Sequence, residues 1–196
     1  MANTREGLYF GYGSNMWKDQ MKLRCPSSAY EGIARLQNYR WIINGRGYAN
    51  IVESSTQNDL TDSDAVWGMT YSLTSEDERA LDANECVPHA YTKETLTVEF
   101  WPTAGLATSA TVVDSPPERV DMLVYIDRRR TEKAVPRKEY VHRMNKGIKD
   151  ALAHGIPTGY VRDVLREFIP EDESEDGARK LAVRQATSFR DSDEGE

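Results

Sequence analysis

The sequence predicts an α+β fold, namely a small mixed β-barrel with packed helices. Short β-prone segments separated by turn signals predict the barrel, and helical patterns at two places along the chain predict the helices around it. The chain has 196 residues, of which 39% are hydrophobic, and this is enough to bury one core of ordinary size. We expect a single domain over residues 6–169, because no repeat or linker divides that range.

The expected strands are short, apolar and bounded by turn residues. The segment Glu94–Trp101 alternates most regularly, with an apolar side chain at every second position. The full set comprises Leu8–Tyr12, Tyr39–Ile43, Tyr48–Val52, Ala65–Leu73, Glu94–Trp101, Ala110–Val113 and Val120–Ile126.

Helical patterns interrupt the strands in the middle and in the last third of the chain. A capping-box pattern at residues 75–78 predicts a short helix over Ser75–Asn84. Pro136 suits the first turn of a second helix that runs to Gly155, and a third helix is expected over Thr158–Phe168. The apolar face of the second helix comprises Tyr140, Met144, Ile148, Ala151 and Leu152.

The charge balance and the hydropathy exclude several classes of protein. Acidic residues outnumber basic ones by 32 to 25, so we expect no nucleic-acid partner, which would need a basic face. No apolar run approaches the roughly 20 residues that span a bilayer, and no signal-peptide pattern opens the chain. We therefore expect no membrane partner and a cytoplasmic location. Residues 170–196 are acidic, and we expect a mobile tail with one weak helix near Ala178–Ala186.

The cysteines and histidines indicate neither a disulfide framework nor a metal centre. Cys25 and Cys86 are too few to staple a fold, so both thiols are expected to be reduced. The three histidines show no ligand spacing with either cysteine, and the sequence therefore predicts no metal site. A hydrolase built on Cys86 and His89 is disfavoured, because residues so close in sequence rarely form a dyad by themselves.

A glycine-rich loop, Gly11-Tyr12-Gly13-Ser14-Asn15, follows the first expected strand. Its two glycines permit unusual backbone angles and the close approach of a ligand. Consecutive backbone N–H groups in such a turn can form a nest that suits a carboxylate or a developing oxyanion. The loop lacks the third glycine of a dinucleotide fingerprint and the Lys-Ser/Thr of a P-loop. On these residues alone, an anion site and an ordinary tight turn both stay open.

The segment Leu8–Met16 closely resembles the N-terminal motif of the γ-glutamylcyclotransferases. Asn15 stands where the glutathione-specific branch usually carries Leu, and the γ-glutamylamine branch has a Tyr-Gly-Thr-Leu type of loop. The chain therefore resembles the γ-glutamyl-amino-acid branch. The resemblance covers most of residues 8–169 and continues through Arg24–Ala29, Ala34–Gln37, Ala65–Gly68, Leu81–Glu85 and Ala153–Pro157.

The resemblance implies a cofactor-free lyase or acyltransferase of glutathione metabolism. The α-amine of a γ-glutamyl group would attack its own γ-amide carbonyl and release 5-oxoproline with a free amine or amino acid. Glu85 matches the family's catalytic glutamate, which would act first as a base and then as an acid. The resemblance also allows a homodimer. The resemblance implies that backbone groups of Tyr9, Phe10, Gly11, Tyr12, Gly13 and Ser14 hold the γ-glutamyl unit. The other substrate-binding residues that it implies are Asn15, Tyr125 and Tyr140.

Two departures from the family pattern follow Glu85. The family often carries Gly at the position of Cys86, and Glu85–Tyr91 is one residue shorter than in animal relatives. The leaving group therefore stays open, with glutathione, a glutathione-type conjugate or a γ-glutamylamine as alternative substrates. A non-catalytic binding or regulatory module on the same fold is the alternative from another class. Arg128–Arg130 is expected to be a solvated turn, with attraction of an acidic substrate as its alternative role.

Overall fold

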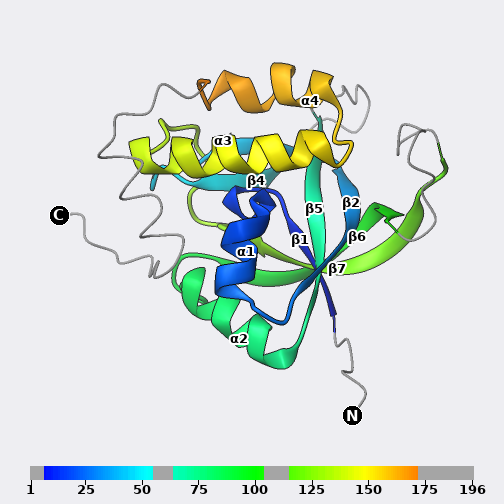
Figure 1. The fold of residues 1–196 in the computed structure, drawn as a ribbon. Helices are drawn as coiled ribbons and strands as arrows, with labels where there is room; N and C mark the ends of the chain where they lie inside the picture. Colours follow the sequence, from blue (N-terminus) through cyan, green and yellow to red (C-terminus); the bar gives the residue numbers. More distant parts are fainter. Residues whose placement is uncertain (1–6, 55–63, 104–114, 172–196) are drawn as a thin grey trace, which may run out of the picture.

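The computed structural model describes residues 7–54, 64–103 and 115–171. Figure 1 shows the longer strands wrapped around one another, with the helices on the outside. In chain order the elements are β1 (Gly7–Gly11), the 3₁₀ turn η1 (Ser14–Met16), α1 (Lys18–Arg24), β2 (Ala29–Gln37), β3 (Tyr39–Ile43), β4 (Ala49–Glu53), β5 (Ala65–Leu73), α2 (Ser75–Asn84), β6 (Thr92–Pro102), β7 (Glu118–Ile126), α3 (Lys138–Ala153), α4 (Thr158–Asp163) and the 3₁₀ turn η4 (Leu165–Glu167).

Five strands of the described chain close a barrel in the order β1-β5-β2-β6-β7. Its neighbours pair antiparallel except for β1 and β7, which run parallel where Tyr9 pairs with Leu123. The expected α+β fold with a small mixed barrel is therefore confirmed. Because the barrel closes between its first and last strands, residues from distant parts of the sequence meet at one end.

The strands β3 and β4 form a separate two-stranded hairpin. The Asn44 N–H donates to the carbonyl of Tyr48 at 2.9 Å, and the Gly47 N–H donates to the carbonyl of Asn44 at 2.8 Å. Gly47 has φ of +85°, a left-handed conformation that glycine adopts without steric cost. This tight turn fixes the positions of the residues on either side of Gly47.

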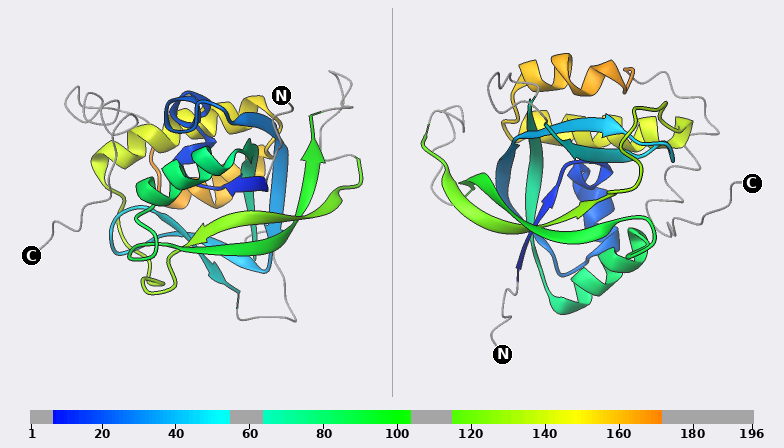
Figure 2. Two further views of the ribbon diagram at one scale, coloured as in Figure 1. Left: turned by 90° about the horizontal axis from the view of Figure 1, so that it is seen from below. Right: turned by 180° about the vertical axis from the view of Figure 1, so that it is seen from behind.

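The helices pack around the barrel and form part of the core. Figures 1 and 2 show α3 and α4 on one side, α2 at the opposite end and α1 between them. A Cβ added to Gly147 of α3 would lie 3.1 Å from the Cβ of Met16, so α3 runs very close to η1. None of the helices in the described ranges has both the length and the apolar character needed to cross a membrane.

Two elements, β2 and α1, were not predicted from the sequence. In β2 the pairing register with β5 shifts between Tyr30 and Gly32, and this irregularity disrupts the alternation of apolar and polar residues. The helix α1 has only seven residues, and its N-cap residue, Trp17, makes no side-chain capping bond. Both elements lack the sequence pattern by which they would be recognised.

Details of the predicted helices differ from the structure. The capping box of α2 is formed by Thr74 and Asp77, one residue earlier than expected, since Asp77 N–H donates to Thr74 Oγ1 at 3.2 Å. Pro136 precedes the N-cap of α3 rather than occupying its first turn, and Leu152 is 38% exposed because it lies outside the buried face. The third predicted helix is divided at Val164 into α4 and η4.

The other expected elements fall outside the described residues. The strand Ala110–Val113 and the weak helix near Ala178–Ala186 lie outside the described residues. Most of the acidic tail, residues 172–196, lies outside them as well.

Candidate active site

A pocket opens where β1, η1, α1, the end of α2, β7 and α3 meet. Its empty volume is about 480 Å³, including the open mouth. Aromatic rings form much of its wall, and one carboxyl group and two guanidinium groups accompany them. The lining residues are Tyr9, Tyr12, Gly13, Ser14, Asn15, Arg24, Tyr48, Ala49, Asn84, Glu85, Tyr91, Tyr125, Tyr140 and Arg143.

The glycine-rich loop forms one wall of the pocket and is held from several sides. The Tyr12 hydroxyl donates to the carbonyl of Tyr125 at 2.5 Å, which ties the loop to the end of β7. The Ser14 N–H donates to the hydroxyl of Tyr140 at 3.2 Å. A Cβ on Gly13 would lie 2.8 Å from that hydroxyl and 3.1 Å from the Cβ of Ala49. Glycine at this position therefore lets the loop lie close to the Tyr140 hydroxyl and to Ala49 of β4.

Glu85 lies at the C-cap of α2, and the end of this helix fixes its position. The Val87 N–H donates to the carbonyl of Asp82 at 3.0 Å, and the Cys86 N–H donates to that of Ala83 at 3.4 Å. These two bonds define a Schellman motif, in which the residue after the cap adopts a left-handed conformation. Cys86 is that residue, with φ of +48°, at a position that is usually glycine in such motifs. The motif turns the chain directly after Glu85.

Asn15 connects the loop to Glu85 through its side-chain amide. Its Nδ2 donates to the Tyr9 hydroxyl at 2.9 Å and to Glu85 Oε1 at 3.3 Å. Its Oδ1 accepts from Gln20 Nε2 at 2.8 Å and from Arg24 NH1 at 3.1 Å. Because both of these partners are donors, the amide can have only one orientation, with its nitrogen toward Glu85. The network therefore presents a hydrogen-bond donor to the carboxylate.

The electrostatic environment of Glu85 is a balance of burial and positive charge. Burial raises the pKa of Glu85 above its ordinary value of 4.5, because desolvation disfavours the carboxylate. Arg24, Arg143 and the bond from Asn15 act in the opposite direction without overcoming it. Burial and the charge of Arg143 also lower the pKa of Arg24 to about 10. Glu85 is thus held closer to neutrality than a solvated carboxylate, as a proton-transfer group requires.

Arg143 is 1% exposed and reaches the loop from α3. Its NH2 lies 3.2 Å from Glu139 Oε2, and its NH1 donates to Ser14 Oγ at 3.2 Å. Gln20 Nε2 donates to the same Ser14 oxygen at 3.0 Å. A hydroxyl has two acceptor positions and one proton. Since both acceptor positions are occupied, Ser14 can donate its proton to an oxygen atom in the pocket.

The family model described as gamma-glutamyl cyclotransferase, AIG2-like, matches residues 9–141. The chain belongs to this family. The match begins at Tyr9 and includes Asn15, Glu85 and Tyr140, whereas Arg143 lies two residues beyond its end.

Individual relatives agree with this assignment. The Bos taurus and Homo sapiens proteins named gamma-glutamylcyclotransferase are each 31% identical to the chain over 90 residues. Each alignment covers 41% of this chain and 44% of the relative, so the chain matches less than half of their length. A solved structure named gamma-glutamyl cyclotransferase has the same fold, with a TM-score of 0.65 at 22% identity. That match covers 91% of this chain and 98% of the other.

Most of the predicted site residues of this family member lie around the pocket. Glu85, Tyr125, Tyr140 and the loop residues Tyr12 to Asn15 line it, as does Tyr9. Phe10 does not, because its side chain is fully buried in the core. Gly11 does not line the pocket either and packs against Tyr9, whose Cε1 would lie 3.3 Å from an added Cβ.

Several lining residues were not predicted, among them the two arginines. Arg24 lies one turn after Gln20 on α1, and Arg143 lies one turn after Tyr140 on α3. Residues three or four positions apart share a helix face, so the position of Tyr140 could have pointed to Arg143. In the described part of the chain, no group of three metal-ligating side chains gathers at this or any other place. The other unpredicted lining residues are Tyr48, Ala49, Asn84 and Tyr91.

Proposed function

We propose that the chain is a γ-glutamylcyclotransferase that releases 5-oxoproline from a γ-glutamyl compound without a cofactor. One observation carries the proposal: Glu85, with its raised pKa, is the one acidic residue among the described residues that line the pocket. It lies against the glycine-rich loop through its bond from Asn15. The family match and the names of the relatives support the same activity. We place the reaction in the cytoplasm.

The enzyme has to transfer protons, whereas the substrate itself already brings the two reacting groups together. The attacking amine and the γ-amide carbonyl belong to one molecule, and well-oriented intramolecular reactions reach effective molarities of roughly 10⁵–10⁸ M. At neutral pH the α-amine is largely protonated, since its pKa is about 8. Glu85 would accept the proton that the amine loses as the new C–N bond forms. It would then return a proton to the leaving nitrogen as the old C–N bond breaks.

The loop would hold the γ-glutamyl group while Glu85 transfers the proton. The proton of Ser14 suits an anionic oxygen, because both acceptor positions of its hydroxyl are occupied by Gln20 and Arg143. Such an oxygen is either the α-carboxylate of the γ-glutamyl group or the oxyanion of the tetrahedral intermediate. The buried charges of Arg24 and Arg143 favour a negatively charged ligand group in the same place.

Asn15 favours a γ-glutamyl amino acid as the substrate class. In the resemblance described above, Asn at this position is typical of the γ-glutamyl-amino-acid branch. Here its side-chain amide donates to both the Tyr9 hydroxyl and Glu85, so Asn15 is itself a part of the site. Glutathione, a glutathione-type conjugate and a γ-glutamylamine are the other substrates to be compared.

The test measures 5-oxoproline release by mass spectrometry from γ-glutamyl-alanine, glutathione, an S-substituted glutathione and γ-glutamyl-ε-lysine. Glu85→Gln keeps the size of the side chain and an acceptor for Asn15, so it should fold and bind substrate. We expect its turnover to fall by about 10²–10⁴-fold, the usual contribution of a general acid–base residue. Glu78→Gln, on the same helix but outside the pocket lining, is the matched control and should retain wild-type turnover.

Two results would overturn the proposal. Full turnover by Glu85→Gln would remove Glu85 from the mechanism. Binding of intact γ-glutamyl compounds by the wild-type protein, with no 5-oxoproline released from any of them, would identify a binding module on the same fold.

A further inference from the structure

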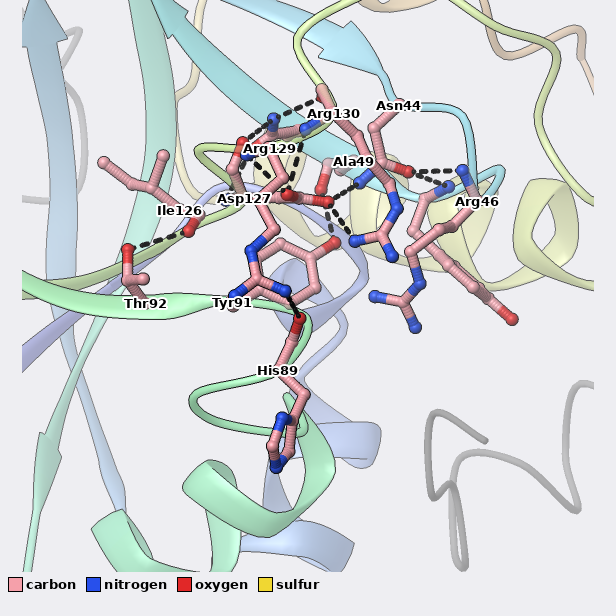
Figure 3. Close-up of polar contacts among 12 residues, drawn as sticks. Asn44, Arg46, Ala49, His89, Tyr91, Thr92, Ile126, Asp127, Arg129 and Arg130 are labelled. Carbon is pink, nitrogen blue, oxygen red and sulfur yellow. Dashed lines mark hydrogen bonds and ion pairs between the residues drawn. The ribbon is translucent and has the colours of Figure 1, made fainter. Parts of the chain in front are cut away.

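Arginine side chains surround two tyrosines of the pocket wall, Tyr48 and Tyr91. The Cζ of Arg46 lies 5.6 Å from the ring centre of Tyr48 and 5.9 Å from that of Tyr91. The Cζ of Arg137 lies 5.4 Å from the Tyr48 ring. Arg129 NH1 donates to the carbonyl of His89, two residues before Tyr91, at 3.5 Å. Figure 3 shows Arg46 and Arg129 reaching the neighbourhood of Tyr91 from two different loops.

A single buried carboxylate fixes both of these loops. Asp127 is 1% exposed, and its Oδ1 accepts from the backbone N–H groups of Arg129 and Arg130 at 3.0 and 3.1 Å. Its Oδ2 accepts from Asn44 Nδ2 at 3.0 Å, and Asn44 Oδ1 in turn accepts from the Arg46 N–H at 3.0 Å. Figure 3 shows this chain of bonds between the two loops. The arginines are therefore presented by a preorganised backbone, which lowers the entropy cost of binding.

The arginines at this side of the pocket differ in whether they form an ion pair with a carboxylate. Arg128 pairs with Glu53 and Glu94, at 2.9 and 2.6 Å, and is not among the residues that line the pocket. Arg130 pairs with Asp127 at 3.2 Å. Arg129 and Arg137 form no ion pair within residues 7–54, 64–103 and 115–171. A positive surface thus borders the pocket in a chain whose net charge is −7.

We propose that Arg46, Arg129 and Arg137 form a subsite for an acidic leaving group, namely an amino acid with a second carboxylate in its side chain. This inference rests on the proposed function. If the γ-glutamyl group occupies the loop and Glu85, the amino acid beyond the scissile amide extends past Tyr48 and Tyr91 toward these arginines. Guanidinium groups form strong charge-assisted hydrogen bonds with carboxylates. An amino acid with only an α-carboxylate offers one anionic group to these three cations, whereas a dicarboxylic amino acid offers two.

The test compares γ-glutamyl-aspartate with γ-glutamyl-asparagine, which have nearly the same shape and differ in one charge. For the wild-type protein we expect kcat/KM to be higher for the aspartate compound by about tenfold, the factor that one charge-assisted hydrogen bond supplies. Arg129→Gln and Arg46→Gln should each bring this ratio toward one, and Arg129→Glu should invert it. The preference should also weaken as the salt concentration rises, because surface charges are screened.

The controls separate this inference from the proposed function. Arg162→Gln removes an exposed arginine that pairs with Asp163 and does not line the pocket, so the ratio should stay at the wild-type value. Turnover of γ-glutamyl-alanine with equal kcat/KM for the aspartate and asparagine compounds would overturn the subsite and leave the proposed function intact. An absence of 5-oxoproline from all three compounds would overturn the proposed function itself.

Discussion

The proposed role of Glu85 combines two requirements that oppose each other, since the side chain lies in a desolvating pocket and would also have to ionise. Burial raises its pKa. The hydrogen bond from Asn15 and the positive charges of Arg24 and Arg143 limit this rise. The ionised form therefore costs free energy in the folded state at neutral pH. A residue that is kept for chemistry at such a cost is typical of functional sites.

This cost predicts how stability depends on pH. The folded-state pKa of Glu85 is raised, so its contribution to the free energy of unfolding is most favourable below the ordinary pKa and is lost as pH rises through the raised value. Glu85→Gln cannot ionise and should be more stable than the wild-type protein at pH 7, with the difference vanishing near pH 4. Urea unfolding of both proteins at the two pH values measures this. A less stable variant at pH 7 would show that the attraction to Arg24 and Arg143 outweighs burial.

Single residues also show how far the sequence could predict the site. Glu85 and Asn15 lie in local motifs, so the residues around them were sufficient. Arg143 carries no such motif, and it reaches the pocket only because α3 approaches η1 closely at Gly147. The side chains of Tyr9 and Phe10 differ for a simple reason: alternate residues of a strand point to opposite faces, so Tyr9 lines the pocket while Phe10 enters the core.

At the scale of elements, the end of α2 decides where Glu85 lies. Its Schellman motif requires a left-handed residue directly after Glu85, and Cys86 takes that conformation with φ of +48°. This conformation costs about 1–2 kcal/mol for a residue with a Cβ and nothing for glycine. The glycine that the family often carries there therefore has a conformational reason.

We expect Cys86→Gly to raise the free energy of unfolding by about 0.5–1 kcal/mol, since the relief of the left-handed conformation exceeds the entropy that glycine adds to the unfolded chain. Urea unfolding with an unchanged m-value is the appropriate measurement. Cys86→Ala is the matched control, because it removes the thiol and keeps the Cβ. If it stabilised the protein as much as Cys86→Gly, the thiol rather than the backbone would be responsible.

The elements that were predicted correctly are those whose ends carry local signals. The strand β3 and its turn into β4 were found because Asn44–Gly47 is a turn sequence in itself. The strand β2 was missed because its bulge at Gly32 interrupts the period of two, and α1 was missed because it is short and uncapped. Local sequence predicts an element only when its pattern or its ends are regular.

At the scale of the whole molecule, closure of the barrel creates the site. Pairing of β1 with β7 brings Tyr9 and Tyr125 together, with ring centres 5.7 Å apart. The end of α2 and the start of α3 add Glu85 and Tyr140 to the same pocket. Many short strands predicted a barrel, but the order of its strands depends on pairing over long sequence distances, which no local pattern encodes.

The most direct test of the account is the pH dependence of kcat/KM for 5-oxoproline formation from γ-glutamyl-alanine. We predict a rise on the acid side through a single ionisation above 4.5, because Glu85 must be ionised to accept the proton and burial raises its pKa. The residual activity of Glu85→Gln should lack this acid limb. A profile that is flat between pH 4 and pH 7, or an acid limb that persists unchanged in Glu85→Gln, would contradict the assignment of Glu85 as the proton-transfer residue.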